Sequence, residues 1–131
     1  MYNTIKGVED MPEYSFNFNI VMTGVLKITI MKLGLIFNKE AIQILGSPAK
    51  INIGYDTKNK ALAIRPAVDS IEIKSYDFAK KGDETWIRVN CKTLVKAIEA
   101  STKINFDTSK SYQATFDEDS NMLIVELSKK Q

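Results

Sequence analysis

The sequence contains no histidine among its 131 residues. Histidine is the commonest general base in enzymes and a frequent zinc ligand, so catalytic arrangements that pair serine or cysteine with histidine are excluded. The single cysteine, Cys91, cannot form an internal disulfide, which fits a reducing compartment. We therefore expect a cytoplasmic protein that is not an enzyme.

Long apolar runs are also missing, and none approaches the ~20 residues that a membrane helix needs. The stretch from Met1 to Pro12 is polar and acidic, without a basic region followed by an apolar one, and it predicts no secretory signal. The composition, with 44% hydrophobic and 26% charged residues, is typical of a globular domain. We expect one domain over residues 1–131 and no contact with a membrane.

Motifs that hold cofactors or metals are not found either. The six glycines are scattered, and no glycine-rich phosphate loop is present. The run Asp117-Glu118-Asp119 lacks the ligand alternation and the glycine of a calcium loop, so a solvated hairpin tip is the favoured interpretation. Cys91 shares an apolar stripe with Leu94 and Ile98 at helical spacing, which favours a buried structural cysteine over a reactive one. We expect no cofactor and no metal.

The chain does contain a repeated pattern. Residues 51–64 reappear in chemical outline as residues 112–125, at a constant offset of 61. In each copy an aromatic residue followed by aspartate ends one strand, a polar loop follows, and a leucine-centred apolar run opens the next strand. Upstream of each copy lies a short helix signal with the same apolar quartet at an offset of 53, formed by Ala41, Ile42, Ile44 and Leu45 and by Leu94, Val95, Ala97 and Ile98.

Each copy therefore predicts a unit of hairpin, helix and hairpin. Asn38 is expected to cap the first helix, and Gly46 to end it. Hairpins this short are not stable alone. We expect an α+β, mostly β fold in which two units share one sheet system or barrel and two short helices cover its open faces or ends.

The expected segments are an N-terminal arm and strand over residues 1–24, a first unit over 25–66 and a second unit over 67–131. The alternation of Tyr14 to Ile20 predicts a strand within the arm. The expected elements of the first unit are strands at 25–31 and 35–37, a helix at 39–45 and a hairpin at 50–65. Those of the second are strands at 70–76 and 85–89, a helix at 91–100, a short strand at 103–106 and a hairpin at 111–127.

Charge is divided unevenly between the units, although the net charge is only +2. Residues 25–66 carry seven basic and two acidic residues, a balance of +5, whereas residues 67–131 carry ten basic and eleven acidic residues, a balance of −1. A basic unit favours contact with a polyanion, and ordinary solvated lysines are the competing interpretation. The candidate DNA-binding residues are Lys27, Lys32, Lys39, Lys58, Lys60 and Arg65.

Aromatic and acidic residues suggest two further contacts. Tyr14, Phe16 and Phe18 form a possible stacking platform for single-stranded bases, with a core strand as the commoner alternative. Trp86 begins a strand beside charged residues, which suits a partner-binding anchor as well as a core residue. With Asp117, Glu118 and Asp119 it supports the alternative hypothesis, a protein-interaction module or inhibitor without nucleic-acid contact.

Residues 26–41, Leu45-Gly46 and the hairpin that ends at Ile64-Arg65-Pro66 together resemble the AbrB/MazE group of swapped-hairpin DNA-binding domains. The resemblance covers about 40 residues, with Asn38 where the group usually has proline and Leu33 interrupting its lysine-glycine turn. It implies a transcriptional regulator or accessory factor of a phage or mobile element. It also implies DNA, single- or double-stranded, as the partner and a barrel completed by dimerisation or by a tandem pair.

The order of elements from Trp86 to Leu127 is also similar to a sliding-clamp domain, in topology rather than in motif. Clamps place inward lysines on helices that face DNA, and this resemblance implies a role for Lys92 and Lys96. Together the two resemblances support a non-enzymatic DNA-associated binding protein, with a protein partner or a homo-oligomer as possible further associations.

Overall fold

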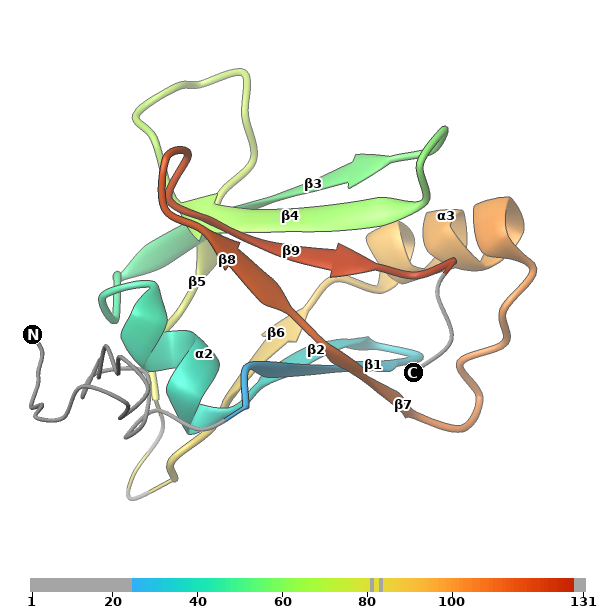
Figure 1. The fold of residues 1–131 in the computed structure, drawn as a ribbon, viewed down its shortest axis with the longest axis horizontal. Helices are drawn as coiled ribbons and strands as arrows, with labels where there is room; N and C mark the ends of the chain where they lie inside the picture. Colours follow the sequence, from blue (N-terminus) through green and yellow to red (C-terminus); the bar gives the residue numbers. More distant parts are fainter. Residues whose placement is uncertain (1–24, 81, 83, 129–131) are drawn as a thin grey trace, which may run out of the picture.

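The computed structural model describes residues 25–80, 82 and 84–128, which form two antiparallel sheets and two helices (Figure 1). The prediction of an α+β, mostly β fold is confirmed. None of the helices in these residues has the length and apolar character that crossing a membrane requires. The expected strand at Tyr14 to Ile20, with the candidate platform of Tyr14, Phe16 and Phe18, lies outside the described residues.

Both sheets combine strands from the two predicted units. The first sheet, sheet A, has the strand order β6 (Ile87–Asn90), β2 (Gly34–Phe37), β1 (Lys27–Met31) and β7 (Lys110–Gln113). The second sheet, sheet B, has the order β5 (Tyr76–Asp77), β3 (Lys50–Asp56), β4 (Ala61–Pro66), β9 (Met122–Glu126) and β8 (Thr115–Asp117).

The chain passes from sheet A to sheet B at Ala114, which separates β7 from β8. The Ala114 amide donates to the Leu26 carbonyl at 2.8 Å, so the crossing point remains bonded to the residue that precedes β1. The predicted hairpin at 111–127 is therefore correct for β8 and β9, whereas β7 pairs with β1 in the other sheet.

Helix α2 (Lys39–Ile44) begins and ends as the sequence predicts. The Asn38 side-chain oxygen accepts from the Ala41 amide at 3.0 Å, which satisfies one of the open amides of the first turn. At the other end, Gly46 has a φ of 84°, and the amides of Gly46 and Ser47 donate to the carbonyls of Gln43 and Ile42. These two backbone hydrogen bonds end the helix. They require a positive φ at Gly46, which glycine adopts without steric cost.

Helix α3 (Lys92–Thr102) lies at the opposite end of the molecule from α2 (Figure 1). Its apolar residues Val95 and Ile98 are fully buried, as their spacing predicts. Lys103 follows in the left-handed region with a φ of 65°, and its amide donates to the Glu99 carbonyl at 2.8 Å. The helix therefore ends without a glycine.

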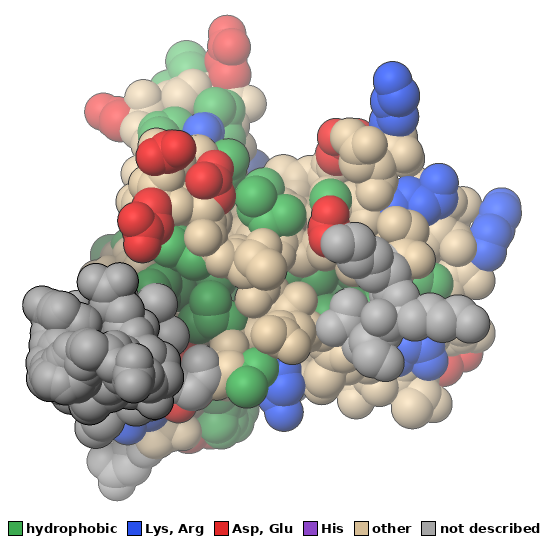
Figure 2. All heavy atoms as spheres, viewed as in Figure 1, with side chains coloured by type: hydrophobic (Ala, Val, Ile, Leu, Met, Phe, Trp, Pro, Cys, Tyr) green, Lys and Arg blue, Asp and Glu red, His purple; other side chains and the backbone are tan. Residues whose placement is uncertain are grey.

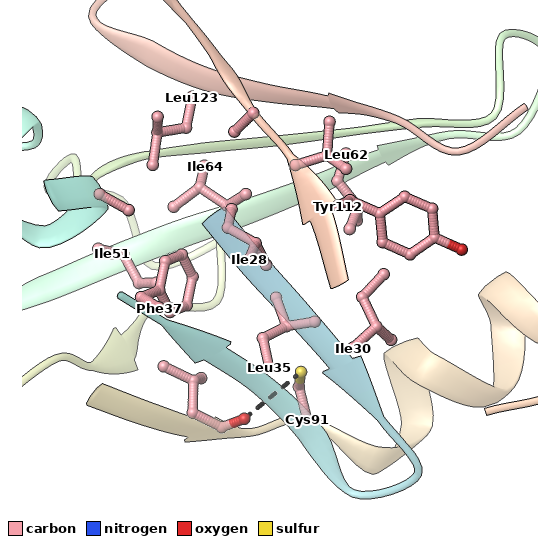
Figure 3. Packing of buried hydrophobic residues seen from close by; sticks show 14 of the residues in the cluster. Ile28, Ile30, Leu35, Phe37, Ile51, Leu62, Ile64, Cys91, Tyr112 and Leu123 are labelled. Carbon is pink, nitrogen blue, oxygen red and sulfur yellow. Dashed lines mark hydrogen bonds between the residues drawn. The ribbon is translucent and has the colours of Figure 1, made fainter. Parts of the chain in front are cut away.

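The core lies between the two sheets (Figure 3). Ile28, Ile30 and Leu35 point inward from sheet A towards the inward side chains of sheet B, and all are inaccessible to solvent. Phe37 meets Phe78 edge-on with ring centroids 5.0 Å apart. The inward side chains of sheet B are Ile51, Leu62, Ile64, Leu123 and Val125.

Two strand predictions are wrong. Residues 70–76 form a loop in which only Tyr76 enters a strand, because the Asn52 side chain bonds the Val68 amide before this segment and the Lys74 carbonyl within it. Residues 103–106 also form a loop, since the Phe106 amide donates to the Glu99 side chain at 2.9 Å rather than to a neighbouring strand. The alternation of apolar and polar residues around Ile71 and Ile73 therefore corresponds neither to strand pairing nor to burial of these side chains.

Candidate nucleic-acid interface

Three lysines follow one side of α3. Lys92 and Lys96 are one turn apart, and Lys103 continues the line two turns further on. All three side chains are exposed, while Val95 and Ile98 on another side of the helix are buried in the core. Glu99 lies on the same line between Lys96 and Lys103, so the line of lysines forms a cationic ridge that this half-buried carboxylate interrupts.

The first turn of α3 concentrates positive charge. It contains no acidic residue, and Lys92 occupies its first position. A positive charge at this position interacts unfavourably with the helix dipole, so Lys92 does not stabilise the helix. A bound anion would interact favourably with both the lysine and the amides of the helix N-terminus.

The turn between β3 and β4 extends this basic surface. The Tyr55 hydroxyl donates to the Ser101 hydroxyl oxygen at 2.9 Å, which joins the end of β3 to the last turn of α3. Lys58 and Lys60 lie on the turn that follows (Figure 1). We call Lys58, Lys60, Lys92, Lys96 and Lys103 together the basic end.

The acidic groups near the basic end are held by local hydrogen bonds. Asp56 accepts from the amides of Lys58 and Asn59, each at 3.0 Å, and the Asn59 amide is the main cause that lowers the Asp56 pKa. The Glu99 carboxylate accepts from the Phe106 amide, on the side of the loop that leaves α3. The hydrogen bonds of Asp56 stabilise the β3–β4 turn, and that of Glu99 stabilises the loop after α3.

Lys32 lies on the β1–β2 turn, which meets the start of α3 through the Cys91 amide and the Leu33 carbonyl, 2.9 Å apart. Its ammonium group forms an ion pair with Asp107. The hydrogen bond from Lys32 lowers the pKa of the Asp107 carboxyl, and the same bond raises the pKa of Lys32. Lys32 is therefore near the basic end but already has a counter-ion.

The other predicted DNA-binding residues lie elsewhere. Lys27 and Lys39 are together at the start of α2, because the Lys27 amide donates to the Asn38 side chain at 3.1 Å. Arg65 lies at the end of β4 far from the Lys58 turn, and its Nε donates to Asn52 Oδ1 at 3.2 Å. The structure thus groups Lys58 and Lys60 with α3, and it does not gather the six predicted residues on one surface.

The predicted protein-interaction residues also fall into two places. Trp86 is 40% exposed and lines a cleft of about 270 Å³ with Arg88 beside β6. Asp117 ends β8, Glu118 and Asp119 follow it on the exposed turn to β9, and Asp117 Oδ2 accepts from the Ser120 hydroxyl at 2.5 Å. Among the described residues, no group of three or more carboxylates or thiols is arranged to hold a metal.

Cys91 is buried, as its apolar spacing predicts, with 6% of its surface exposed. Its thiol contacts the Val89 carbonyl, with Sγ and O 3.8 Å apart (Figure 3). Burial raises the pKa of the Cys91 thiol to about 11, because the low-dielectric surroundings disfavour the thiolate. The cysteine is therefore protonated and inaccessible at neutral pH.

Lys103 is absent from the set predicted by charge balance and by resemblance. The net charge of residues 67–131 does not reveal Lys103, because acidic residues near the β8–β9 turn and on the β4–β5 loop offset the lysines of α3 in the sum. A helical projection of Lys92, Lys96 and Lys103 against Val95 and Ile98 would have found the ridge. Figure 2 shows several Lys and Arg side chains over α3 and the β3–β4 turn, with a few Asp and Glu among them, and a group of Asp and Glu side chains at the opposite end.

Compared with models of protein families, with curated proteins and with solved structures, the chain matches none.

Proposed function

We propose that this chain is a non-enzymatic DNA-associated protein that binds the phosphate backbone through its basic end. The observation that carries the proposal is the ridge of Lys92, Lys96 and Lys103 on α3, beside Lys58 and Lys60 on the adjoining turn. Closely spaced cations on a convex element suit the regular charge of a nucleic-acid backbone. The contact proposed here is centred on residues 67–131 rather than on the basic first unit.

The non-enzymatic part of the proposal is supported by the chemistry of the chain. Without histidine, the remaining nucleophile of interest is the Cys91 thiol, which is buried and has a pKa of about 11. Nucleophilic catalysis by cysteine requires an accessible thiolate. The basic end therefore favours binding as its role.

We further propose that residues 25–66 and 67–131 are two copies of one unit related by a twofold axis. At the offset of 61, Leu62 corresponds to Leu123 and Ile64 to Val125, and the register of β4 with β9 pairs Leu62 with Val125 and Ile64 with Leu123. In a twofold arrangement, if a residue of one copy pairs with a second residue of the other copy, their counterparts pair as well, and these pairs follow that rule. The turns agree as well, since Lys60 and Asn121, 61 residues apart, have φ angles of 54° and 59°.

The strand exchange between the units supports a shared barrel. Ile51 of β3 pairs with Tyr76 of β5, and Tyr112, the counterpart of Ile51, pairs with Ile28 of β1. The first strand of each unit, β1 or β5, thus pairs with the third strand of the other unit, β7 or β3. This is the arrangement expected of a swapped-hairpin pair within one chain, in line with the AbrB/MazE resemblance.

Fluorescence anisotropy with labelled duplex and single-stranded DNA tests the binding proposal. The variant Lys92→Gln, Lys96→Gln, Lys103→Gln should lose at least about tenfold in affinity, because three phosphate contacts are removed. The control Lys27→Gln, Lys39→Gln, Lys80→Gln removes the same charge away from the basic end and should retain most of the affinity. Equal losses in both variants, or no binding by the unaltered protein to either DNA, would refute the proposal.

A further inference from the structure

A second surface lies at the end of the molecule opposite the basic end. The loop between β4 and β5, residues 67–75, stands over the outer face of sheet B and leaves a cleft of about 260 Å³ beneath it. Most of the side chains that line the cleft are apolar or small. They include Ile53, Gly54, Ala63, Ile73 and Met122.

Asn52 fixes the loop that forms the wall of this cleft. It is the one buried polar side chain in the described residues, with 4% of its surface exposed. Its Oδ1 accepts from the Val68 amide at 3.0 Å, and its Nδ2 donates to the Lys74 carbonyl at 3.1 Å. Because a buried amide without partners is costly, these bonds hold both ends of the loop against the sheet.

The same loop exposes apolar side chains. Ile71 at its tip is fully exposed, and Val68 and Ile73 are 43% and 41% exposed. Of these three side chains, Ile73 lines the cleft, so a partner that fills the cleft gains free energy by covering Ile73.

Acidic residues flank the cleft on the β4–β5 loop and at the β8–β9 turn, although none is among the residues that line it. Met122 in its lining pairs directly with Asp117, the first residue of the acidic turn, and Glu118 and Asp119 follow. Asp69 and Glu72 lie on the loop itself. Figure 2 shows Asp and Glu side chains over this loop and turn, away from the Lys and Arg side chains over α3.

Two nearby cations, Arg65 and Lys74, offset only part of the charge of the five carboxylates. Arg65 lines the cleft, and its Nε donates to Asn52 Oδ1. The Lys74 ammonium lies 5.0 Å from the centre of the Tyr76 ring. A ligand that combines aliphatic side chains with positive charge would therefore fit the surface in both respects.

We propose that this cleft, which we call the acidic cleft, binds a basic peptide segment of a protein partner by inserting one of its aliphatic side chains beside Ile73. The rim carboxylates attract the basic residues on either side of the inserted side chain, and the apolar lining supplies the buried contact. The acidic cleft and the basic end lie at opposite ends, so one molecule can hold DNA and the partner together. This proposal does not depend on DNA binding.

A fluorescent peptide with two leucines flanked by lysines is the probe, titrated into the full-length protein. Ile73→Ser should weaken binding about tenfold, because it removes roughly one aliphatic contact. Ile71→Ser is the matched control, since it makes the same change at the loop tip outside the lining, and it should keep the affinity within about twofold. Glu118→Gln with Asp119→Asn should weaken binding and reduce its dependence on salt.

Three outcomes would overturn this proposal. One is a peptide affinity that Ile73→Ser leaves unchanged, and another is equal binding by a peptide in which serines replace the leucines, since both would indicate charge attraction alone. The third is self-association of the protein, measured by sedimentation, that the peptide disrupts, since a second copy would then be the occupant. DNA affinity measured on the Ile73→Ser protein should stay unchanged whatever the peptide does.

Discussion

Ala63 of β4 and Ile124 of β9 lie opposite each other in sheet B, and they occupy positions 61 residues apart in the chain. This separation equals the offset of the sequence repeat. On either side of the pair, Leu62 meets Val125, the counterpart of Ile64, and Ile64 meets Leu123, the counterpart of Leu62, which is the relation expected at a twofold axis. The strand pairing therefore supports the proposed twofold relation between the two units.

Separated halves of the chain should not fold alone. Strand β1 pairs with β7, and β3 pairs with β5, so both sheets need strands from both halves. Fragments 1–70 and 71–131, divided in the exposed loop, should each lack ordered structure and should form a 1:1 complex when mixed. Circular dichroism and size-exclusion chromatography measure this, and a stable fold in either isolated fragment would contradict it.

Gly34 should tolerate no side chain. A Cβ at this position would lie 2.0 Å from the Val89 carbonyl oxygen in the neighbouring strand β6. Gly34→Ala should therefore force β2 and β6 apart and lower the free energy of unfolding by about 1–3 kcal/mol. Gly54→Ala is the control, because a Cβ there meets nothing within 4 Å, and urea denaturation should show a change below about 1 kcal/mol. Similar losses in both variants would contradict the close approach.

Asn38 should stabilise the entry into α2 by more than an ordinary cap. Its Oδ1 accepts from the amides of Lys27 and Ala41, and its Nδ2 donates to the Val25 carbonyl at 2.8 Å. Asn38→Ala should cost about 1–2 kcal/mol in thermal or urea unfolding. Asn38→Asp keeps both acceptor bonds and loses only the donor, so its cost should be smaller. An alanine variant as stable as the aspartate variant would disprove this role.

Much of the local structure could be predicted from sequence, because the deciding interactions are close in the chain. The Asn38 cap, the Gly46 helix end and the hairpin of β3 and β4 all depend on residues within a few positions of one another. The loop at 70–76 depends on Asn52, whose bonding partners Val68 and Lys74 are 16 and 22 positions away, and no pattern within the loop reveals these contacts. Local alternation therefore predicted a strand where a distant amide holds a loop.

The candidate site was only partly predictable for a related reason. Charge balance along the chain favoured residues 25–66, but folding brings the turn that carries Lys58 beside the lysines of α3. It also places Lys27 and Arg65 away from that end. The grouping of these lysines depends on tertiary contacts, which charge balance along the chain does not reveal.

The Cys91 thiol should resist modification in the folded protein. Because burial raises its pKa from 9.0 to about 11, the folded state favours the neutral thiol. The resulting contribution to stability is complete below pH 9 and declines as the pH rises from 9 towards 11, since the unfolded chain loses its proton first. A thiol reagent such as Ellman's reagent at pH 8 should react at the rate of global unfolding and fully in guanidinium. Rapid labelling of the native protein would contradict the buried assignment.

The central claim, DNA binding through the basic end, is tested most directly by the dependence of DNA affinity on salt. A plot of the logarithm of the binding constant against the logarithm of salt concentration should have a slope of about −4.5 for duplex DNA, because each of about five phosphate contacts contributes roughly −0.9. The variant Lys92→Gln, Lys96→Gln, Lys103→Gln should shift this slope by nearly three units towards zero. A slope that this variant leaves unchanged would place the contact elsewhere and contradict the account.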